Sequence, residues 1–341
     1  MRKKGLKIIA MIVMISMMVS LIGCSSSSTS GNSGGGVKFI NIATASTGGT
    51  YYPIGVGMAT LWTEKLKGVN ASAQSSAGSV ENIELLRNGE AQLAIFQGLI
   101  GSMAYQGKGI FEGKKYDGLR SISMLWPNVE HFVLKENLAK TGNILDLKGS
   151  NFSVGPQASG TEQSTMVIFE GVGLSKADIK PDYLGYNDSA EAIKDGRISG
   201  ASMPAGIPVA AVTDLYASKA GVKILEFTDE QLASINKLYN TWFRFVIPVG
   251  TYPGQKEEIK TIAQPNWLGV ANTVDEKLVY DLTKTLFENL DYMYSVHNSA
   301  KNIKLETALN GLPVPLHIGA YKYFKEKGLK IPEYLIPPEA K

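Results

Sequence analysis

Three short segments rich in glycine and hydroxyl residues have the composition of an anion-binding site. They are Thr47–Tyr51, Ser75–Ser79 and Ser159–Thr161, and each lies between a predicted strand and a predicted helix. A helix N-terminus has unpaired N–H groups and about half a positive charge, so it attracts anions. Glycines let a ligand approach the backbone, and hydroxyls add hydrogen bonds. Each segment alone is typical of ordinary turns and caps, but the three together favour a small anionic ligand.

Familiar catalytic and cofactor motifs are missing from the sequence. Gly48-Gly49 lacks the third glycine of a dinucleotide fingerprint, and no Gly-Lys-Ser/Thr follows it as in a phosphate-binding P-loop. No Gly-x-Ser-x-Gly elbow is present. Glu130 precedes His131, but neighbouring residues of a strand point to opposite faces, so we expect no dyad. We therefore predict no catalytic residue, no enzymatic activity and no cofactor.

Metal and disulfide chemistry have few residues to use. The chain has one cysteine and three histidines, His131, His297 and His317. One cysteine excludes a disulfide framework, and a zinc site would need nearly all of these residues. We expect His297 and His317 to be structural or surface residues, and we predict no metal site.

Four further side chains are candidates for a ligand cleft. Tyr51, Gln97 and Tyr186 lie at predicted strand ends or in loops, where a ligand could contact them. Arg244 lies in the aromatic-rich stretch 239–248, which predicts a strand. Its guanidinium could bind a carboxylate with two hydrogen bonds, or it could be an exposed strand residue. Both alternatives stay open for Arg244.

The composition is that of a folded α/β protein rather than of a nucleic-acid-binding or disordered one. The chain has 341 residues, of which 44% are hydrophobic and 19% charged, and its formal net charge is +3. This profile excludes a disordered chain and contains no basic tract of the nucleic-acid-binding type. The length suits two domains or one large α/β unit.

The N-terminal segment has the pattern of a lipoprotein export signal. Four basic residues, the last of them Lys7, precede an apolar run over residues 8–22 that is too short to span a membrane. The run ends in Leu-Ile-Gly-Cys, which resembles a bacterial lipobox with Cys24 as the lipidated residue. We expect a signal peptide over 1–23 and a flexible tether over 24–36; the alternative is a soluble secreted protein. Removal of 1–23 takes away four positive charges and changes the net charge from +3 to −1.

Strands and helices alternate from Val37 onward. This alternation predicts a mostly parallel sheet with helices on both faces. Thr228–Gln231 and Thr273–Glu276 have capping-box spacing ahead of helices. The expected strands are 39–45, 71–74, 92–96, 121–125, 152–155, one near Tyr183, 198–203 and 223–227, and the expected helices are 53–66, 79–88, one from Glu162 and 189–194.

The chain shows signs of two such α/β units. A strand, a Gly/Ser/Thr loop and a helix occur early and again at 155–162, which would place two similar loops across a cleft. The apolar segments 131–134 and 267–271 are candidates for strands that cross between the lobes. We therefore expect lobe 1 to comprise residues 37–131 and 270–341, and lobe 2 to comprise 132–269.

Several of these motifs together resemble the TAXI family, the extracytoplasmic solute receptors of tripartite ATP-independent periplasmic (TRAP) transporters. Asn41–Tyr52 is similar to the opening strand and loop of that family, and 78–97 to its Ser-x-x-Asn helix and the strand that ends in Gln. Residues 147–162 resemble the start of its second lobe. Residues 282–290 and 313–320 resemble its C-terminal region, so the resemblance extends over about 37–328.

The resemblance implies a two-lobed type II periplasmic-binding-protein fold that closes on a ligand. It implies binding of a small carboxylated metabolite, such as glutamate, glutamine or a 2-oxoacid like 2-oxoglutarate, and its delivery to a membrane permease. No arginine clamp is expected in this family, and no role is transferred to Asn128 or Glu130. With Arg244 from the residue argument, the predicted ligand-binding residues are Thr47, Gly48, Gly49, Thr50, Tyr51, Gly78, Ser79, Gln97, Ser159, Gly160, Thr161 and Arg244.

The resulting hypothesis is a monomeric, lipid-anchored, extracytoplasmic solute receptor that binds neither nucleic acid nor a cofactor. Two other classes stay open. A surface-anchored enzyme acting on a small organic acid would need an acid–base pair, which a strongly perturbed carboxyl group beside His131 would supply. An adhesin or structural lipoprotein would have no enclosed polar cavity.

Overall fold

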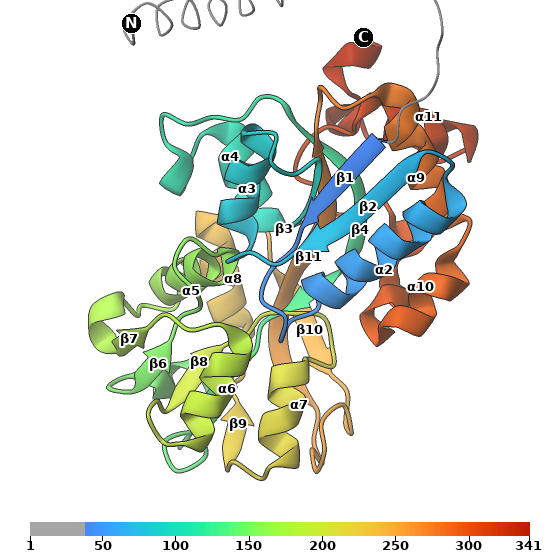
Figure 1. The fold of residues 1–341 in the computed structure, drawn as a ribbon. Helices are drawn as coiled ribbons and strands as arrows, with labels where there is room; N and C mark the ends of the chain where they lie inside the picture. The colour runs from blue at the N-terminus through green and yellow to red at the C-terminus, as the bar shows by residue number, and fades with distance from the viewer. Residues whose placement is uncertain (1–37) are drawn as a thin grey trace, which may run out of the picture. The chain divides into compact units, whose positions relative to one another are not determined.

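A computed structural model describes residues 38–341, which form two mixed β-sheets flanked by helices (Figure 1). Residues 37–341 are a compact unit by themselves. The predicted signal peptide, the lipidation site Cys24 and the predicted tether lie outside the described residues.

The first sheet has six strands in the order β10-β11-β3-β1-β2, and β4 also pairs with β11. β1 pairs in parallel with β2 and β3, whereas β11 is antiparallel to each of its three neighbours. The strands are β1 (Lys38–Ala43), β2 (Val69–Gln74), β3 (Leu93–Gln97), β4 (Leu119–Val129), β10 (Phe243–Ile247) and β11 (Ile259–Ala271).

β4 and β11 are longer than the sequence predicted. We expected strands at 121–125 and 267–271, but both continue through a proline. Pro127 lies opposite Pro265 in the register, where neither residue has an N–H to donate. The register shifts next to this pair, between Asn266 and Trp267. The prolines hid the continuity of these strands, because proline is ordinarily excluded from the middle of a sheet.

The second sheet has five short strands in the order β7-β6-β8-β5-β9. β6 pairs in parallel with β7 and β8, and β5 is antiparallel to β8 and β9. Both sheets are therefore mixed, and parallel pairs are fewer than the alternation of elements suggested. The strands are β5 (Phe132–Lys135), β6 (Asn151–Ser153), β7 (Lys180–Asp182), β8 (Gly200–Ser202) and β9 (Val222–Ile224).

The strand pairing does not follow the predicted lobe boundary at 269/270. β10 and β11 fall within the range assigned to lobe 2, but they hydrogen-bond in the first sheet. Of the two segments expected to cross between lobes, 267–271 is the end of β11, while 131–134 overlaps β5 (Phe132–Lys135) of the second sheet. The lobe boundaries stay a prediction.

Helices connect the strands and cover the sheets. α2 packs against α9 and α10, which come from the far end of the chain, and α11 lies against α9 (Figure 1). The buried Trp62 of α2 donates its indole N–H to Leu282 O of α9 at 3.0 Å, which fixes this packing. The helices are α2 (Tyr51–Lys65), α3 (Ser79–Arg87), α4 (Gly98–Gln106), α5 (Gly160–Gly171), α6 (Tyr186–Lys194), α7 (Ala210–Ala217), α8 (Asp229–Leu238), α9 (Glu276–Phe287), α10 (Leu290–Val296) and α11 (Ile318–Glu326).

Short 3₁₀ turns occupy much of the remaining chain. They are η1 (Gly109–Phe111), η2 (Ile144–Leu147), η3 (Lys176–Asp178), η4 (Asn298–Asn302), η5 (Leu305–Thr307), η6 (Glu333–Leu335) and η7 (Pro338–Ala340). None of the helices within residues 38–341 is long and apolar enough to cross a membrane.

One of the two predicted capping boxes is confirmed. Thr228 accepts from Gln231 N at 3.2 Å, and the Gln231 side chain accepts from Thr228 N at 2.9 Å. The second prediction was wrong, because α9 is capped by Asp275, which accepts from Leu278 N at 2.9 Å. Asp275 lies two residues after Thr273 and is an equally good N-cap residue, so spacing alone did not separate the two.

Candidate functional site

A small cavity of about 30 Å³ lies where the three predicted loops meet. It is lined by the first residues of α2, α3 and α5, the last residue of β3 and the start of α6. Eight of the twelve predicted ligand-binding residues line it, namely Gly49, Thr50, Tyr51, Gly78, Ser79, Gln97, Gly160 and Thr161. The structure therefore brings together residues that lie more than 100 positions apart in the sequence.

Three helix N-termini converge on this cavity. Tyr51 begins α2, Ser79 begins α3, and Gly160 and Thr161 begin α5. The backbone N–H groups of these four residues have no acceptor within residues 38–341. Since the first N–H groups of a helix find no partner inside the helix, they are available to a ligand. The arrangement offers several N–H donors to one small anion.

The loop before α3 depends on a glycine. Gly78 has φ +123° and ψ −154°, a conformation that essentially only glycine adopts. A Cβ there would also lie 3.7 Å from the Cβ of Ser159 and 3.8 Å from the N of Gly160. Contacts at these distances are ordinary, so the backbone conformation rather than a lack of space requires glycine at position 78.

The hydroxyl groups around the cavity bind other parts of the protein rather than pointing freely at a ligand. Thr50 Oγ1 donates to Gly206 O at 3.0 Å, and Tyr186 OH donates to Pro204 O at 2.7 Å. Because the Tyr186 proton is used there, Thr161 Oγ1 donates to Tyr186 OH at 2.9 Å. The protons of these three hydroxyls are therefore used within the protein. The donors that remain within residues 38–341 are backbone N–H groups, Gln97 Nε2 and the hydroxyls of Ser46 and Ser79, which only accept from backbone N–H groups.

Several of these bonds join the loops after the first sheet to the loops after the second. Besides Thr50 to Gly206, Tyr186 N donates to Ser46 Oγ at 3.3 Å. Glu81 N of α3 donates to Ala158 O at 3.2 Å. These contacts hold the loops together around a cavity with room for about one water molecule.

No Asp, Glu, Lys, Arg or His side chain lines the cavity. Its two titratable residues are Tyr51 and Tyr186, and burial raises the pKa of both phenols, so both are neutral at physiological pH. An anion bound here would be stabilised by oriented N–H groups rather than by a cationic side chain.

Two chains of buried polar side chains lie behind the cavity. In the first, Ser164 Oγ donates to Gln97 Oε1 at 2.8 Å and accepts from Gln264 Nε2 at 3.0 Å. Gln264 Nε2 also donates to Glu130 Oε1 at 3.3 Å. In the second, Tyr51 OH donates to Asn266 Oδ1, and Asn266 Nδ2 donates to Asn128 Oδ1 at 3.1 Å.

Glu130 and His131 are both fully buried but do not form an acid–base pair. The Glu130 carboxyl accepts from Trp242 Nε1 at 3.0 Å, and its Oε2 has no partner within residues 38–341. His131 contacts Val129 O at 2.8 Å and Tyr252 OH at 2.7 Å instead. Burial raises the pKa of Glu130 to about 7 and lowers the pKa of His131 to about 4. A carboxyl group with a perturbed pKa therefore lies beside His131, as the enzyme hypothesis required. The two residues lie in the connection between β4 and β5 rather than in a strand, and their side chains make separate contacts.

Comparison with known families places the chain. Residues 42–328 match the NMT1-like family. The chain belongs to this family. The match covers all of the loops that line the cavity and every strand of the two sheets except the first four residues of β1.

Several solved structures are similar to this NMT1-like protein at low sequence identity. A protein from Bordetella bronchiseptica RB50 is 15% identical with a TM-score of 0.50, covering 88% of this chain and 85% of that one. The periplasmic aliphatic sulphonate binding protein SsuA from Escherichia coli is 14% identical with a TM-score of 0.44, covering 76% and 78%. A putative L-cystine ABC transporter protein from Listeria monocytogenes is 14% identical with a TM-score of 0.47, covering 76% and 94%.

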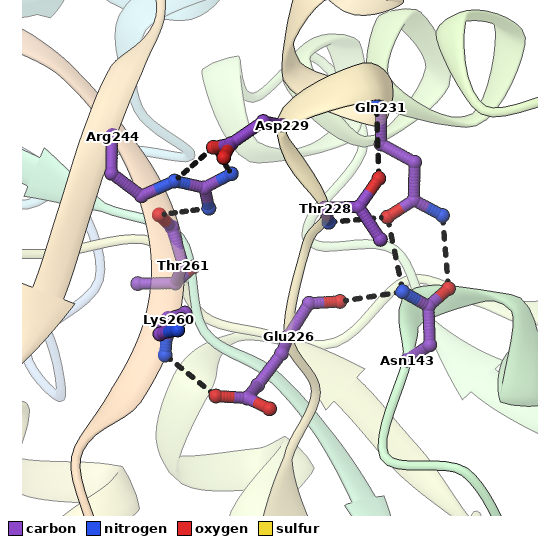
Figure 2. Close-up of polar contacts among 8 residues, drawn as sticks. All are labelled: Asn143, Glu226, Thr228, Asp229, Gln231, Arg244, Lys260 and Thr261. Carbon is purple, nitrogen blue, oxygen red and sulfur yellow. Dashed lines mark hydrogen bonds and ion pairs between the residues drawn. The ribbon is translucent and has the colours of Figure 1, made fainter.

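The structure does not bring Arg244 to the cavity of this NMT1-like protein. Figure 2 shows its guanidinium paired with Asp229, at 2.7 Å and 3.1 Å, and donating to Thr261 O at 2.9 Å. Arg244 lies in β10 and lines a separate surface hollow of about 520 Å³, which also contains Glu226 and Lys260. Of the two alternatives for Arg244, the contacts favour a structural ion pair at the surface.

Replacement of Arg244 by Gln is expected to leave carboxylate binding unchanged. The Kd should stay within about twofold of the wild-type value, because the side chain does not line the cavity. Unfolding free energy should change by less than about 1 kcal/mol, since the Asp229 side chain is 87% exposed. Calorimetric titration and urea unfolding of the R244Q variant measure both. A Kd more than about tenfold higher would return Arg244 to the ligand site.

The other three predicted residues lie beside the cavity. Thr47 is exposed, with its hydroxyl 3.5 Å from Asn187 Nδ2. Gly48 is buried against Asn187, where a Cβ would be 2.2 Å from Asn187 Oδ1. Ser159 caps α5 by accepting from Glu162 N at 2.9 Å. These residues shape the loops, while their neighbours line the space.

A larger hollow of about 600 Å³ lies elsewhere, with Met124, Phe243, Pro265 and Lys304 among the residues that line it. None of the twelve predicted residues lines it. Within residues 38–341 no group of three or more His, Cys, Asp or Glu side chains could hold a metal ion. We therefore take the 30 Å³ cavity, where the three predicted loops meet, as the candidate ligand site, despite its small volume.

Sequence analysis missed the polar residues behind the cavity. Asn128, Glu130, Gln264 and Asn266 are buried, and they alternate with apolar or proline residues in and next to β4 and β11. Residues two apart on a strand share a face, so two polar residues at that spacing inside an apolar run were the available signal. Ser164 gave no such signal, because a serine within a helix is unremarkable.

Proposed function

We propose that this NMT1-like protein is the solute receptor of a membrane transport system and binds a small carboxylated metabolite at the converging N-termini of α2, α3 and α5. The observation that carries the proposal is that three helix N-termini meet at one cavity that no charged side chain lines. A carboxylate is small, planar and a strong acceptor, so it suits a cluster of backbone N–H groups. Membership of the NMT1-like family, together with the type II fold that the sequence resemblance implies, supports a binding role rather than an enzymatic one.

The receptor would open to admit its ligand. A cavity of about 30 Å³ holds one water molecule, so a metabolite of the size of glutamate enters only when the loops of the two sheets separate. The bonds from Thr50 to Gly206 and from Glu81 to Ala158 would break on opening and form again around the ligand. Closure by hinge motion is a common response of two-lobed binding proteins.

We further propose that the partner is a TRAP permease and that the protein is a monomeric TAXI-type receptor. The supporting observation is the order of motifs from Asn41 to the C-terminal region. The expected ligands are glutamate, glutamine or a 2-oxoacid such as 2-oxoglutarate. A lipid on Cys24 would hold the receptor at the outer face of the membrane, as the export signal in the sequence suggests.

Isothermal titration of the full chain in mild detergent tests the binding role. L-glutamate, L-glutamine and 2-oxoglutarate are the first ligands, followed by a broad thermal-shift panel of other carboxylated metabolites, with putrescine and glycerol as cationic and neutral controls. We expect micromolar or tighter binding of at least one carboxylate and no binding of the controls. If no carboxylated metabolite in the panel binds, the proposal is wrong.

Uptake measurements separate the two kinds of transporter. In membrane vesicles containing the partner permease, a TRAP system takes up the ligand under an ion gradient without ATP. A strict requirement for ATP would contradict the TRAP assignment and leave the receptor role intact.

A further inference from the structure

The side chain of Gln97 can present either a donor or an acceptor to the cavity, and its surroundings decide which. Gln97 is the last residue of β3, is 3% exposed and lines the cavity. A glutamine amide carries an acceptor oxygen and a donor NH₂ group at opposite ends of a nearly symmetric plane. The orientation of this amide therefore fixes the polarity that a ligand meets.

The orientation of the Gln97 amide depends on that of the Gln264 amide. Leu99 N, the second backbone N–H of α4, donates to Gln264 Oε1 at 3.0 Å. A backbone N–H can only donate, so this end of the Gln264 amide must be the oxygen. Its Nε2 then faces Ser164 and Glu130, and the two protons of that group meet Ser164 Oγ at 3.0 Å and Glu130 Oε1 at 3.3 Å.

Ser164 links the Gln264 amide to the Gln97 amide through two hydrogen bonds. Ser164 Oγ accepts from Gln264, so its own proton is free to donate, and it does so to Gln97 Oε1 at 2.8 Å. Ser164 and Gln264 are completely buried, so no water competes for these bonds. Gln97 Nε2 has no acceptor within residues 38–341, which leaves it as the polar atom of this side chain that a ligand can engage.

We propose that Gln264 and Ser164 are positioning residues that hold Gln97 with its amide nitrogen available to the ligand, so that this donor-only site on Gln97 selects a carboxylate over a carboxamide. With the oxygen of Gln97 engaged, the backbone N–H groups of Tyr51, Ser79 and Thr161 and the amide of Gln97 all donate. A carboxylate accepts at both oxygens, whereas a carboxamide must place its NH₂ group against one of these donors. This inference rests on the proposed function, because it concerns the same ligand group.

The S164A variant tests the proposal through ligand selectivity. Without the hydroxyl, Gln97 can rotate its amide and offer its oxygen to a ligand NH₂ group. The probes are L-glutamate, L-glutamine and isoglutamine, which differ only by amidation of one carboxyl group. We expect the wild-type protein to bind glutamate at least about tenfold more tightly than one of the two amides, and S164A to reduce that ratio to about threefold or less.

The neighbouring residue Thr165 provides the matched control. Thr165 lies on the same helix, is equally buried, and its hydroxyl has no partner within residues 38–341. The T165V variant removes that hydroxyl at nearly constant volume and should keep the wild-type selectivity ratio. A purely structural effect at either position would weaken glutamate and both amides by the same factor.

The outcomes distinguish this inference from the proposed function. Equal affinity of the wild-type protein for glutamate and both amides would overturn the donor-only site while leaving a carboxylate receptor in place. An unchanged selectivity ratio in S164A would likewise overturn the role of Ser164 and Gln264. Failure of the wild-type protein to bind any of the three probes, together with failure of the wider carboxylate panel, would instead remove the proposed function and this inference with it.

Discussion

Alanine at position 160 is expected to abolish binding of carboxylated ligands while leaving the protein folded. Gly160 is the first residue of α5 and lines the cavity. A Cβ there would lie 2.6 Å from Gln97 Oε1 and 2.9 Å from the Cβ of Ser79, distances that no real Cβ adopts. The added methyl group would fill the cavity and push the start of α3 away from the start of α5. We expect the Kd to rise at least about 100-fold, or about 2.7 kcal/mol of binding free energy.

The G196A variant is the control for this experiment. Gly196 has φ +75°, and a Cβ there meets nothing within 4 Å. Alanine at this position strains the backbone by about 1 kcal/mol without a clash, and Gly196 does not line the cavity. Calorimetric titration of both variants should show binding by G196A and none by G160A. A G160A protein with wild-type affinity would show that the ligand does not bind where α3 and α5 meet.

Glu130 and His131 are expected to make opposite contributions to the pH dependence of stability. The pKa of Glu130 is raised by burial to about 7, above its unfolded value near 4.5, so the folded state retains this proton over that range. Its contribution to stability is present at low pH and is lost as the pH rises through 7. The pKa of His131 is lowered to about 4 from 6.5, so its contribution is present above pH 6.5 and is lost as the pH falls through 4. In the wild-type protein the two effects largely cancel.

Single substitutions should expose each effect. The free energy of unfolding of E130Q minus that of the wild-type protein is expected to rise by about 3 kcal/mol between pH 4.5 and pH 8, because only the wild-type protein must bury a carboxylate at the higher pH. The same difference for H131Q should fall by a similar amount over that range. Urea unfolding at several pH values measures both, and other titrating groups cancel in the difference. Flat difference curves would show that water or a counter-charge reaches these side chains.

The sequence predicted the loops of the site better than it predicted the strands behind them. Gly/Ser/Thr segments between a strand and a helix depend on local chemistry, and the structure brings Gly49, Ser79 and Thr161 to one cavity. Their role in binding a ligand stays a prediction. Arg244 was ambiguous for the opposite reason, because its partner Asp229 begins α8, and only the tertiary packing of α8 near β10 brings the two residues together.

Helix α4 was not predicted because tertiary packing determines its sequence. Gly101 lies inside this helix, where glycine is locally unfavourable. A Cβ at that position would be 2.2 Å from Cζ2 of Trp267, so the glycine makes room for a buried indole from β11. The same helix supplies the N–H of Leu99 that orients Gln264. A weak local signal thus concealed an element that contributes to the site.

A crystal structure of the full chain with the tightest-binding carboxylate would test the central claim most directly. We predict a carboxylate whose oxygens lie about 2.7–3.2 Å from backbone N–H groups at the starts of α2, α3 and α5, with no arginine or lysine side chain in contact. A ligand found in the larger hollow beside Lys304, or a carboxylate paired with Arg244, would contradict it.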